Sequence, residues 1–296
     1  MISALRAGLI LAAAVCVTLL AAAAEKVKIV ASFSILGDMV EQVAGEHAQV
    51  TTIVGPDADA HVYQPSISDA RAVAKADIIF VNGLGFETWS DTLIAESGTE
   101  ATIHVATHGI APIEVEGGID PHAWNSLTNG MIYIRNIETA LSAAMPEHAA
   151  DFAANASAFV AEIEALDAET RAKLTDLPAS KRTIVTAHDA FGYLADAYGL
   201  NFLAPVGIDT EAEASARDVA VLIDQINAEG AAALFVENIT SPALVEQISA
   251  ETGIAVGGRL YSDALSERGG PATGYLAMYR HNLTTLVNAL GQHTPG

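Results

Sequence analysis

The sequence predicts an α/β protein of two lobes, each a parallel β-sheet flanked by helices, joined by one long rigid helix. Three observations support this fold class. The chain has 296 residues, of which 51% are hydrophobic, enough for two cores and too apolar for disorder. Short β-branched runs alternate with longer Ala-rich amphipathic stretches, a pattern typical of parallel strands with helical crossovers. One helical stretch near the middle is also longer than a single lobe needs.

Residues 1–24 predict a cleavable signal peptide. Arg6 precedes an uncharged run of Leu, Val and Ala over residues 7–24, which ends in small residues before the first acidic side chain, as secretory signals do. An uncleaved anchor is the alternative, because about 18 apolar residues are just enough to span a bilayer. Cys16, the only cysteine, lies within this run and is not expected to carry a lipid. The exported, periplasmic chain would therefore lack thiolate ligands, disulfides and cysteine nucleophiles.

Two sets of four strand-like runs define the lobes. We expect the N-terminal lobe over residues 25–145 and the C-terminal lobe over residues 177–296. The expected strands cover 27–33, 50–54, 78–82 and 103–106 in the first lobe, and 183–187, 201–206, 233–237 and 254–257 in the second. The helical stretches between them include 37–44, 68–74, 215–229 and 242–252. Because parallel strands need crossover connections, each lobe should be α/β.

The connecting helix is predicted over residues 146–176. Pro146 suits the first helical position, and Pro178 follows shortly after the expected end near Leu174. Its apolar face comprises Phe152, Phe159, Ile163, Leu166 and Leu174. A continuous helix of roughly 29 residues would be about 43 Å long, long enough to tie the lobes together stiffly. An ordinary helix within one lobe is the alternative.

Four candidate metal ligands follow strand-like or turn-like stretches: His61, His122, His188 and Asp263. Crevices in open parallel sheets form beyond the carboxyl ends of the strands, so two ligands from each half would meet in a cleft between the lobes. Three imidazoles and one carboxylate predict a closed cage for a single ion, with zinc favoured over manganese because manganese prefers oxygen donors. The other histidines are interpreted as surface or hydrogen-bonded residues: His47, His104, His108, His148, His281 and His293. For His104 and His108, remnants of an auxiliary metal site are the alternative.

The formal net charge is -22, which limits the classes of partner. A polyanion would be repelled, so nucleic-acid binding is excluded. Cations would be attracted over several ångströms of solvent. Acidity also keeps proteins soluble, so the charge alone does not identify a cation receptor.

Four segments together resemble one known family: residues 61–65 (His-Val-Tyr-Gln-Pro), 82–89, 120–124 (Asp-Pro-His-Ala-Trp) and 186–193. The chain resembles, over residues 25–296, the TroA-like (cluster A-I) solute-binding proteins of bacterial zinc and manganese ABC importers. The resemblance implies one metal held between two lobes by His61, His122, His188 and Asp263. Manganese members usually have glutamate where this chain has His188, and the donor set is most similar to that of AztC-type periplasmic zinc receptors. Zinc members often carry a His-rich loop before the Asp-Pro-His motif, and here residues 113–119 are short and contain no histidine.

We therefore expect a periplasmic high-affinity receptor that captures Zn²⁺ and delivers it to the membrane permease of an ABC importer. It should be a monomer and not an enzyme, and a periplasmic zinc metallochaperone is an open candidate for a second partner. The alternatives are a manganese receptor, a metal-binding adhesin, and a secreted zinc hydrolase with Asp263 as base. A dinucleotide enzyme is poorly supported, because residues 82–85 lack the third glycine of the fingerprint.

Three expectations concern how such a cage would work. Affinity should fall below about pH 6.5, the ordinary histidine pKa, because protonated imidazole cannot bind metal. The metal-free protein should loosen its second lobe or a loop, since a stiff connecting helix resists a wide hinge. Glu237, at the end of an expected strand, is a candidate to orient a ligand histidine, and an ordinary surface acid is the alternative.

Overall fold

The computed structural model describes residues 26–115 and 118–291. The predicted signal peptide, Cys16 and His293 lie outside these ranges, as does Gly117 in the short segment before the Asp-Pro-His motif. Among the described helices, none combines the length and the apolar character that crossing a membrane requires.

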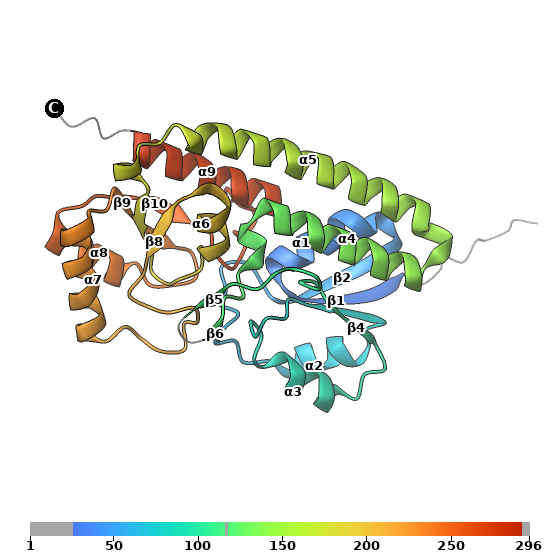
Figure 1. The fold of residues 1–296 in the computed structure, drawn as a ribbon. Helices are drawn as coiled ribbons and strands as arrows, with labels where there is room; N and C mark the ends of the chain where they lie inside the picture. Colours follow the sequence, from blue (N-terminus) through green and yellow to red (C-terminus); the bar gives the residue numbers. More distant parts are fainter. Residues whose placement is uncertain (1–25, 116–117, 292–296) are drawn as a thin grey trace, which may run out of the picture.

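The first sheet is parallel and has the strand order β2-β1-β3-β4. Its strands are β1 (Val27–Phe33), β2 (Ala48–Val54), β3 (Ile78–Val81) and β4 (Thr102–Val105). Helices α1 (Ser34–Ala44) and α4 (Leu127–Ala144) cover one face, and α2 (Ile67–Ala74) and α3 (Ser90–Ser97) lie on the other (Figure 1). A short antiparallel hairpin, β5 (Glu114–Val115) with β6 (Gly118–Ile119), precedes the second lobe.

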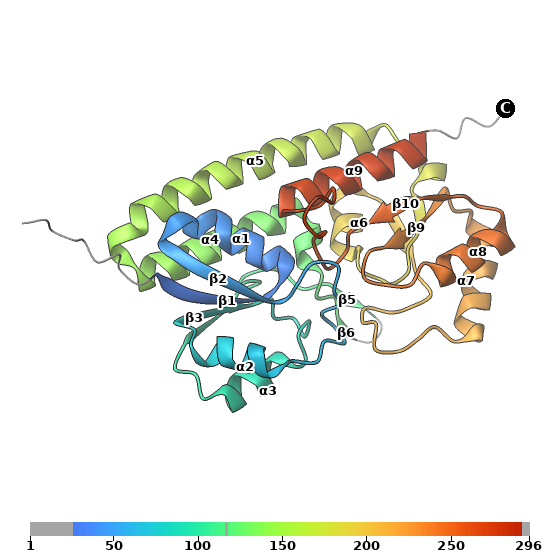
Figure 2. The same cartoon turned by 180° about the vertical axis from the view of Figure 1, so that it is seen from behind.

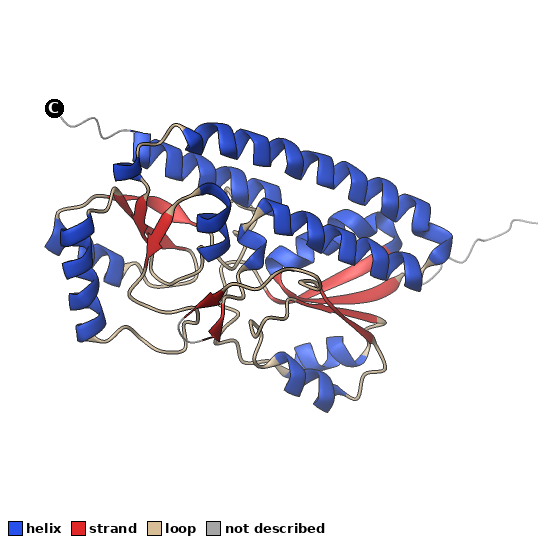
Figure 3. Cartoon of the chain, viewed as in Figure 1, coloured by secondary structure: helices blue, strands red, loops and turns tan. Residues whose placement is uncertain are grey.

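The second sheet is also parallel, with the order β10-β9-β7-β8. Its strands are β7 (Thr183–Val185), β8 (Asn201–Leu203), β9 (Ala233–Glu237) and β10 (Val256–Leu260). Helices α7 (Ala216–Glu229) and α8 (Ala243–Thr252) flank its outer side, whereas α6 (Gly192–Tyr198) and α9 (Tyr275–Gly291) lie toward the rest of the molecule (Figure 3). The predicted class of two helix-flanked parallel sheets is confirmed.

Helix α5 (Ala149–Thr175) runs along one side of the molecule and spans both lobes, as Figures 1 and 2 show from opposite sides. It packs on α1 and α4 in the first lobe and on α6 and α9 in the second. The prediction of a long helix is confirmed. Pro146 opens a separate 3₁₀ turn (Pro146–His148), and the α-helix begins at Ala149.

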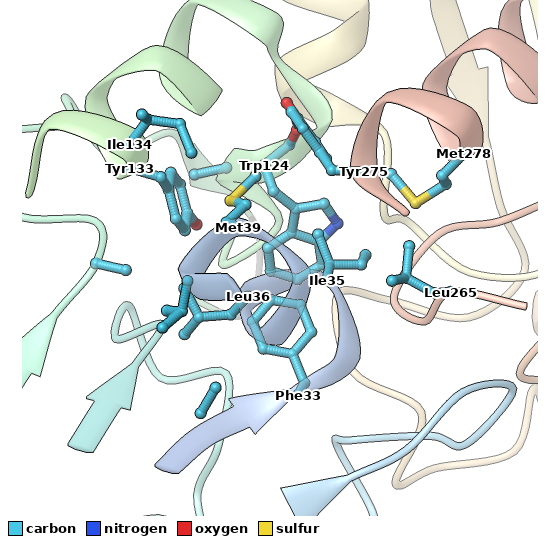
Figure 4. Close-up of a cluster of buried hydrophobic side chains, with 14 of the residues drawn as sticks. Phe33, Ile35, Leu36, Met39, Trp124, Tyr133, Ile134, Leu265, Tyr275 and Met278 are labelled. Atoms are coloured by element: carbon cyan, nitrogen blue, oxygen red, sulfur yellow. Dashed lines mark hydrogen bonds between the residues drawn. The ribbon is translucent and has the colours of Figure 1, made fainter. Parts of the chain in front are cut away.

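One hydrophobic core extends from the first sheet through α5 and α9 into the second lobe. At its centre, between α1 and α9, lies the buried indole of Trp124 (Figure 4). The Trp124 Nε1–H donates to the Ser262 carbonyl at 2.8 Å, and the Tyr275 hydroxyl donates to the Trp124 carbonyl at 2.8 Å. Residues close in sequence to His122 and Asp263 are thus hydrogen-bonded to each other across the two lobes. A second, smaller cluster lies between the second sheet and the α7–α8 layer.

Three expected strands of the second lobe have different ends, and β8 stops at Leu203 instead of residue 206. β7 stops at Val185 instead of residue 187, because the Glu237 carboxylate accepts the backbone N–H groups of Ala187 and His188 at 2.8 and 3.0 Å. β10 begins two residues later than expected, since Gly253 ends α8 with a φ of 73° and the chain needs a connection before it re-enters the sheet.

Candidate metal centre

The structure brings all four predicted ligands together. His61 lies in the loop after β2, His122 follows the β5–β6 hairpin, His188 follows β7, and Asp263 follows β10. The first two belong to the N-terminal sheet region and the last two to the C-terminal one. His122, His188 and Asp263 are fully buried, and His61 is 5% exposed.

Asp263 lies at the centre of the group. Its Oδ2 is 3.3 Å from His61 Nε2 and 3.1 Å from His188 Nε2, and its Oδ1 is 3.6 Å from His122 Nε2. The Nε2 atoms of His61 and His122 are 3.2 Å apart. A tetrahedral zinc ion with bonds of about 2.0–2.1 Å has ligand atoms roughly 3.3 Å from one another. The donor atoms already have that spacing.

The hydrogen bonding of the group also fits a cation. Both carboxylate oxygens of Asp263 are buried and face imidazole nitrogens, with no conventional hydrogen bond assigned to either oxygen. Leaving a buried carboxylate unsatisfied costs free energy, so the site requires positive charge beside Asp263. A divalent metal bound to all four side chains supplies that charge, and so do protons on the histidines when metal is absent.

Two of the clustered histidines, His122 and His188, are each oriented by a second carboxylate. The Asp120 Oδ1 lies 2.8 Å from His122 Nδ1 and accepts the His122 backbone N–H at 2.9 Å. The Glu237 Oε2 lies 2.7 Å from His188 Nδ1. Carboxylates that contact the Nδ1 of metal-binding histidines direct Nε2 toward the ion. Sequence reasoning identified Glu237 but gave Asp120 no role, although its position two residues before His122 in the Asp-Pro-His motif was the available signal.

Aromatic rings and a loop contact position His61. The ring of Phe86 packs edge-on against His61 at a centroid distance of 4.8 Å and lies 6.0 Å from His122. The Trp89 indole N–H donates to the Ala60 carbonyl at 2.8 Å, and Asp59 Oδ1 accepts the His61 N–H at 2.9 Å. The apolar side of the site excludes water and strengthens the electrostatic contacts within it.

The electrostatics of the group are those of tightly coupled charges. Burial by itself would lower the pKa of His122, but the Asp263 and Asp120 carboxylates raise it to about 9. Burial would likewise lower the pKa of His188, but Glu237 and Asp263 raise it well above the ordinary value. Burial would raise the pKa of Asp263, but His188 and His122 hold it well below its usual range. The neighbouring imidazoles therefore favour the anionic form of Asp263, which in turn attracts positive charge to the group.

The structure gives no support to the alternative that His104 and His108 are remnants of an auxiliary site. His104 lies on β4, where its ring packs against Phe80 at 5.4 Å and burial lowers its pKa. His108 is exposed. In residues 26–115 and 118–291, neither belongs to a group of side chains spaced for a metal ion.

Comparison with known proteins identifies the family to which the chain belongs. Residues 29–289 match the family described as ZnuA, zinc-uptake complex component A, periplasmic. Since this match covers most of the chain, it includes both sheets, the connecting helix and all four residues of the cluster.

Individual relatives have names that mention different metals. The chain is 34% identical over 269 residues to the manganese-binding lipoprotein MntA of Halalkalibacterium halodurans, covering 90% of each chain. It is 36% identical over 274 residues to the iron-binding protein YfeA of Yersinia pestis, covering 91% of this chain and 88% of that one. The solved structure of the periplasmic zinc-binding protein TroA of Treponema pallidum matches with a TM-score of 0.85 at 29% identity, covering 90% of this chain and 99% of that one.

Proposed function

Because the chain belongs to the ZnuA family of periplasmic metal-uptake components, we propose that it captures Zn²⁺ outside the cytoplasmic membrane and delivers it to the permease of an ABC importer. The family is a transporter substrate-binding component and not an enzyme family. The hydrolase reading of Asp263 as a general base is accordingly set aside. The metal is cargo, so binding and release are the whole of the mechanism.

We propose that His61, His122 and His188 bind the ion through Nε2 and that Asp263 binds it through its carboxylate. The observation that carries this proposal is the buried Asp263, whose two oxygens have no hydrogen-bond partner and lie 3.1–3.6 Å from three imidazole nitrogens. Two ligands come from each lobe, so an ion bound there links the two halves. Four protein donors leave no position for an activated water, as expected of a carrier.

Zinc is favoured by the donor set. The names of the relatives include manganese, iron and zinc, so they do not select among the metals. Three neutral imidazoles suit zinc, whereas manganese prefers carboxylate, carbonyl and water oxygens. A manganese receptor is the second candidate, supported by the relatives named for that metal. A competition between the two ions distinguishes the candidates.

The path of the ion into the site passes through a pocket of about 250 Å³ that His61 shares with residues of both lobes. Its rim includes Asp209 and Glu211 from the loop after β8 and Gly118 from the β5–β6 hairpin. Carboxylates at an entrance raise the local concentration of cations. At the inner end, the ion exchanges water for nitrogen and oxygen ligands.

The predicted organisation completes the proposal. A cleaved signal peptide at residues 1–24 would export the chain, followed by lobes at 25–145 and 177–296 and the connecting segment at 146–176. The exported protein would be a monomer whose partner is the membrane permease, with a zinc metallochaperone as an open second partner.

The test is a metal titration of protein purified without added metal. We expect one equivalent of Zn²⁺ to bind, and Mn²⁺ to compete only at large excess. Asp263→Ala and His188→Ala should lower zinc affinity by at least 100-fold, because each removes a ligand. The control His108→Ala should bind like the wild type. Unchanged affinity in both variants would contradict the proposed four-ligand site. Preferential binding of Mn²⁺ would establish the manganese alternative.

A further inference from the structure

A second group of potential metal ligands lies on the surface of the N-terminal lobe. It comprises His47, His148 and Asp151, whose donor atoms all lie within 4.8 Å of one another. His47 ends the 3₁₀ turn after α1, and the other two lie at the start of α5. The segments are about 100 residues apart in sequence and meet only because α5 packs on α1.

This group is separate from the cage. His47 directly precedes Ala48, which pairs with Val27 at the amino ends of β2 and β1. The cage lies beyond the carboxyl ends of the same strands. Seven-residue strands rise by roughly 3.3 Å per residue, so about 20 Å of sheet separates the two sites.

The contacts within the group are those of a partly assembled site. His47 Nε2 lies 3.0 Å from Asp151 Oδ2, and the His47 and His148 rings stack with centroids 3.9 Å apart at 21°. Phe152 packs edge-on against His47 at 5.6 Å and fixes one side of that ring. One donor nitrogen of His148 lies within 4.8 Å of the donor atoms of both His47 and Asp151. Asp151, in the first turn of α5, also offsets the positive end of the helix dipole beside a bound cation.

We propose that His47, His148 and Asp151 form a second, solvent-accessible binding site for a divalent transition metal. Two imidazoles and one carboxylate select ions such as Cu²⁺, Ni²⁺ or Zn²⁺ over Mg²⁺, Ca²⁺ and Mn²⁺. The side chain of Asp151 is 62% exposed and that of His47 is 19% exposed, so water completes the coordination. Such an ion exchanges more easily than one in the fully buried cage, and it would clamp the turn after α1 to the start of the connecting helix.

Copper is the probe, since it binds most tightly in the divalent series and reports its nitrogen ligands by electron paramagnetic resonance. The protein is first given one equivalent of Zn²⁺ and then titrated with Cu²⁺. We expect one further equivalent to bind with hyperfine structure from two nitrogen donors. His47→Ala and His148→Ala should each remove that equivalent, Asp151→Asn should weaken it several-fold, and His108→Ala should leave it unchanged.

Thermal melting of the variants without metal shows whether they are folded. The proposal is overturned if no further equivalent binds, or if folded His47→Ala and His148→Ala both retain the two-nitrogen signal. The site does not rest on the proposed function. If the cage failed to hold zinc, the wild type would still bind one more copper than His47→Ala, and the two failures would be distinguishable.

Discussion

The Glu237 side chain shows how one residue both ends a strand and orients a proposed metal ligand. Its Oε1 accepts hydrogen bonds from the backbone N–H groups of Ala187 and His188, and its Oε2 lies 2.7 Å from His188 Nδ1. One carboxylate therefore fixes the main chain and the ring of His188 together. Its exposed fraction of 2% excludes the alternative of an ordinary surface acid.

Glu237→Gln should weaken metal binding roughly 10–100-fold, the effect typical of losing a carboxylate behind a ligand histidine. The amide retains the size of the side chain but lacks the charge that favours the correct ring orientation. Calorimetric titration with Zn²⁺ measures the change. Glu246→Gln, on the exposed face of α8, is the matched control. Wild-type affinity in Glu237→Gln would show that backbone bonding alone orients His188.

Metal affinity should rise with pH up to about 9. In the metal-free protein the Asp263 and Asp120 carboxylates raise the pKa of His122 to about 9, so this imidazole carries a proton at pH 7 that must leave before Nε2 can bind metal. Acidification through that pKa therefore stabilises the protonated, metal-free form, and affinity falls by up to about tenfold per pH unit for each proton displaced. The onset lies well above the value of 6.5 inferred from an isolated histidine. Titrations in buffers of different ionisation enthalpy measure the protons released, and a flat profile from pH 9 to 7 would contradict the prediction.

At the scale of elements, α6 begins with a glycine because the first lobe leaves no room for a side chain. A Cβ on Gly192 would lie 2.4 Å from Asp120 Oδ2, the carboxylate that orients His122. Tyr193, the next residue, donates its hydroxyl to the Asp120 carbonyl at 3.1 Å. The start of α6 in one lobe thus supports a ligand in the other.

Gly192→Ala should displace Asp120 and lower both stability and zinc affinity. Overpacking of this kind typically costs about 1–3 kcal/mol, and affinity should fall by an order of magnitude or more as the His122 ring loses its partner. Chemical denaturation and metal titration measure the two effects. Gly207→Ala, in the same lobe with no atom within 4 Å of the added Cβ, should change neither. A stability loss without an affinity loss would show that Asp120 is not needed for binding.

The elements that could be predicted from sequence are those with a local signal. β1 and β9 match their expected bounds because apolar residues make up most of both strands. Helix α4 was not among the expected elements, although Ser126 caps it at the N-terminus. The β5–β6 hairpin also went unassigned, since two-residue strands carry too little pattern. The four proposed ligands were found from strand-end positions and motif resemblance. Asp59 and Asp120 were given no role, although each lies two residues before a proposed ligand and accepts its backbone N–H.

At the scale of the whole molecule, the two lobes are held together on one side and meet through loops on the other. On the helical side, α5 and α9 belong to a single core that spans both lobes. On the cleft side, the contacts are polar. The Thr210 hydroxyl of the second lobe donates to Asp59 Oδ2 at 2.5 Å, while Asp59 Oδ1 accepts the His61 backbone N–H. Asp57 in the same loop also hydrogen-bonds to Asn238, Leu265 and Glu267 of the second lobe. Opening a packed core costs far more than releasing one such hydrogen bond.

Loss of metal should therefore loosen the loops around the cleft and leave the arrangement of the lobes unchanged. Hydrogen exchange of the metal-free and zinc-bound protein should differ mainly in residues 55–61 and 206–213, with little change along α5. Thr210→Val, which removes the donor to Asp59, should speed zinc release several-fold, whereas Thr284→Val on the exposed face of α9 should not. If the exchange difference instead extends through α5, the core shared by the lobes opens on metal release. The lobes would then move relative to each other about a hinge.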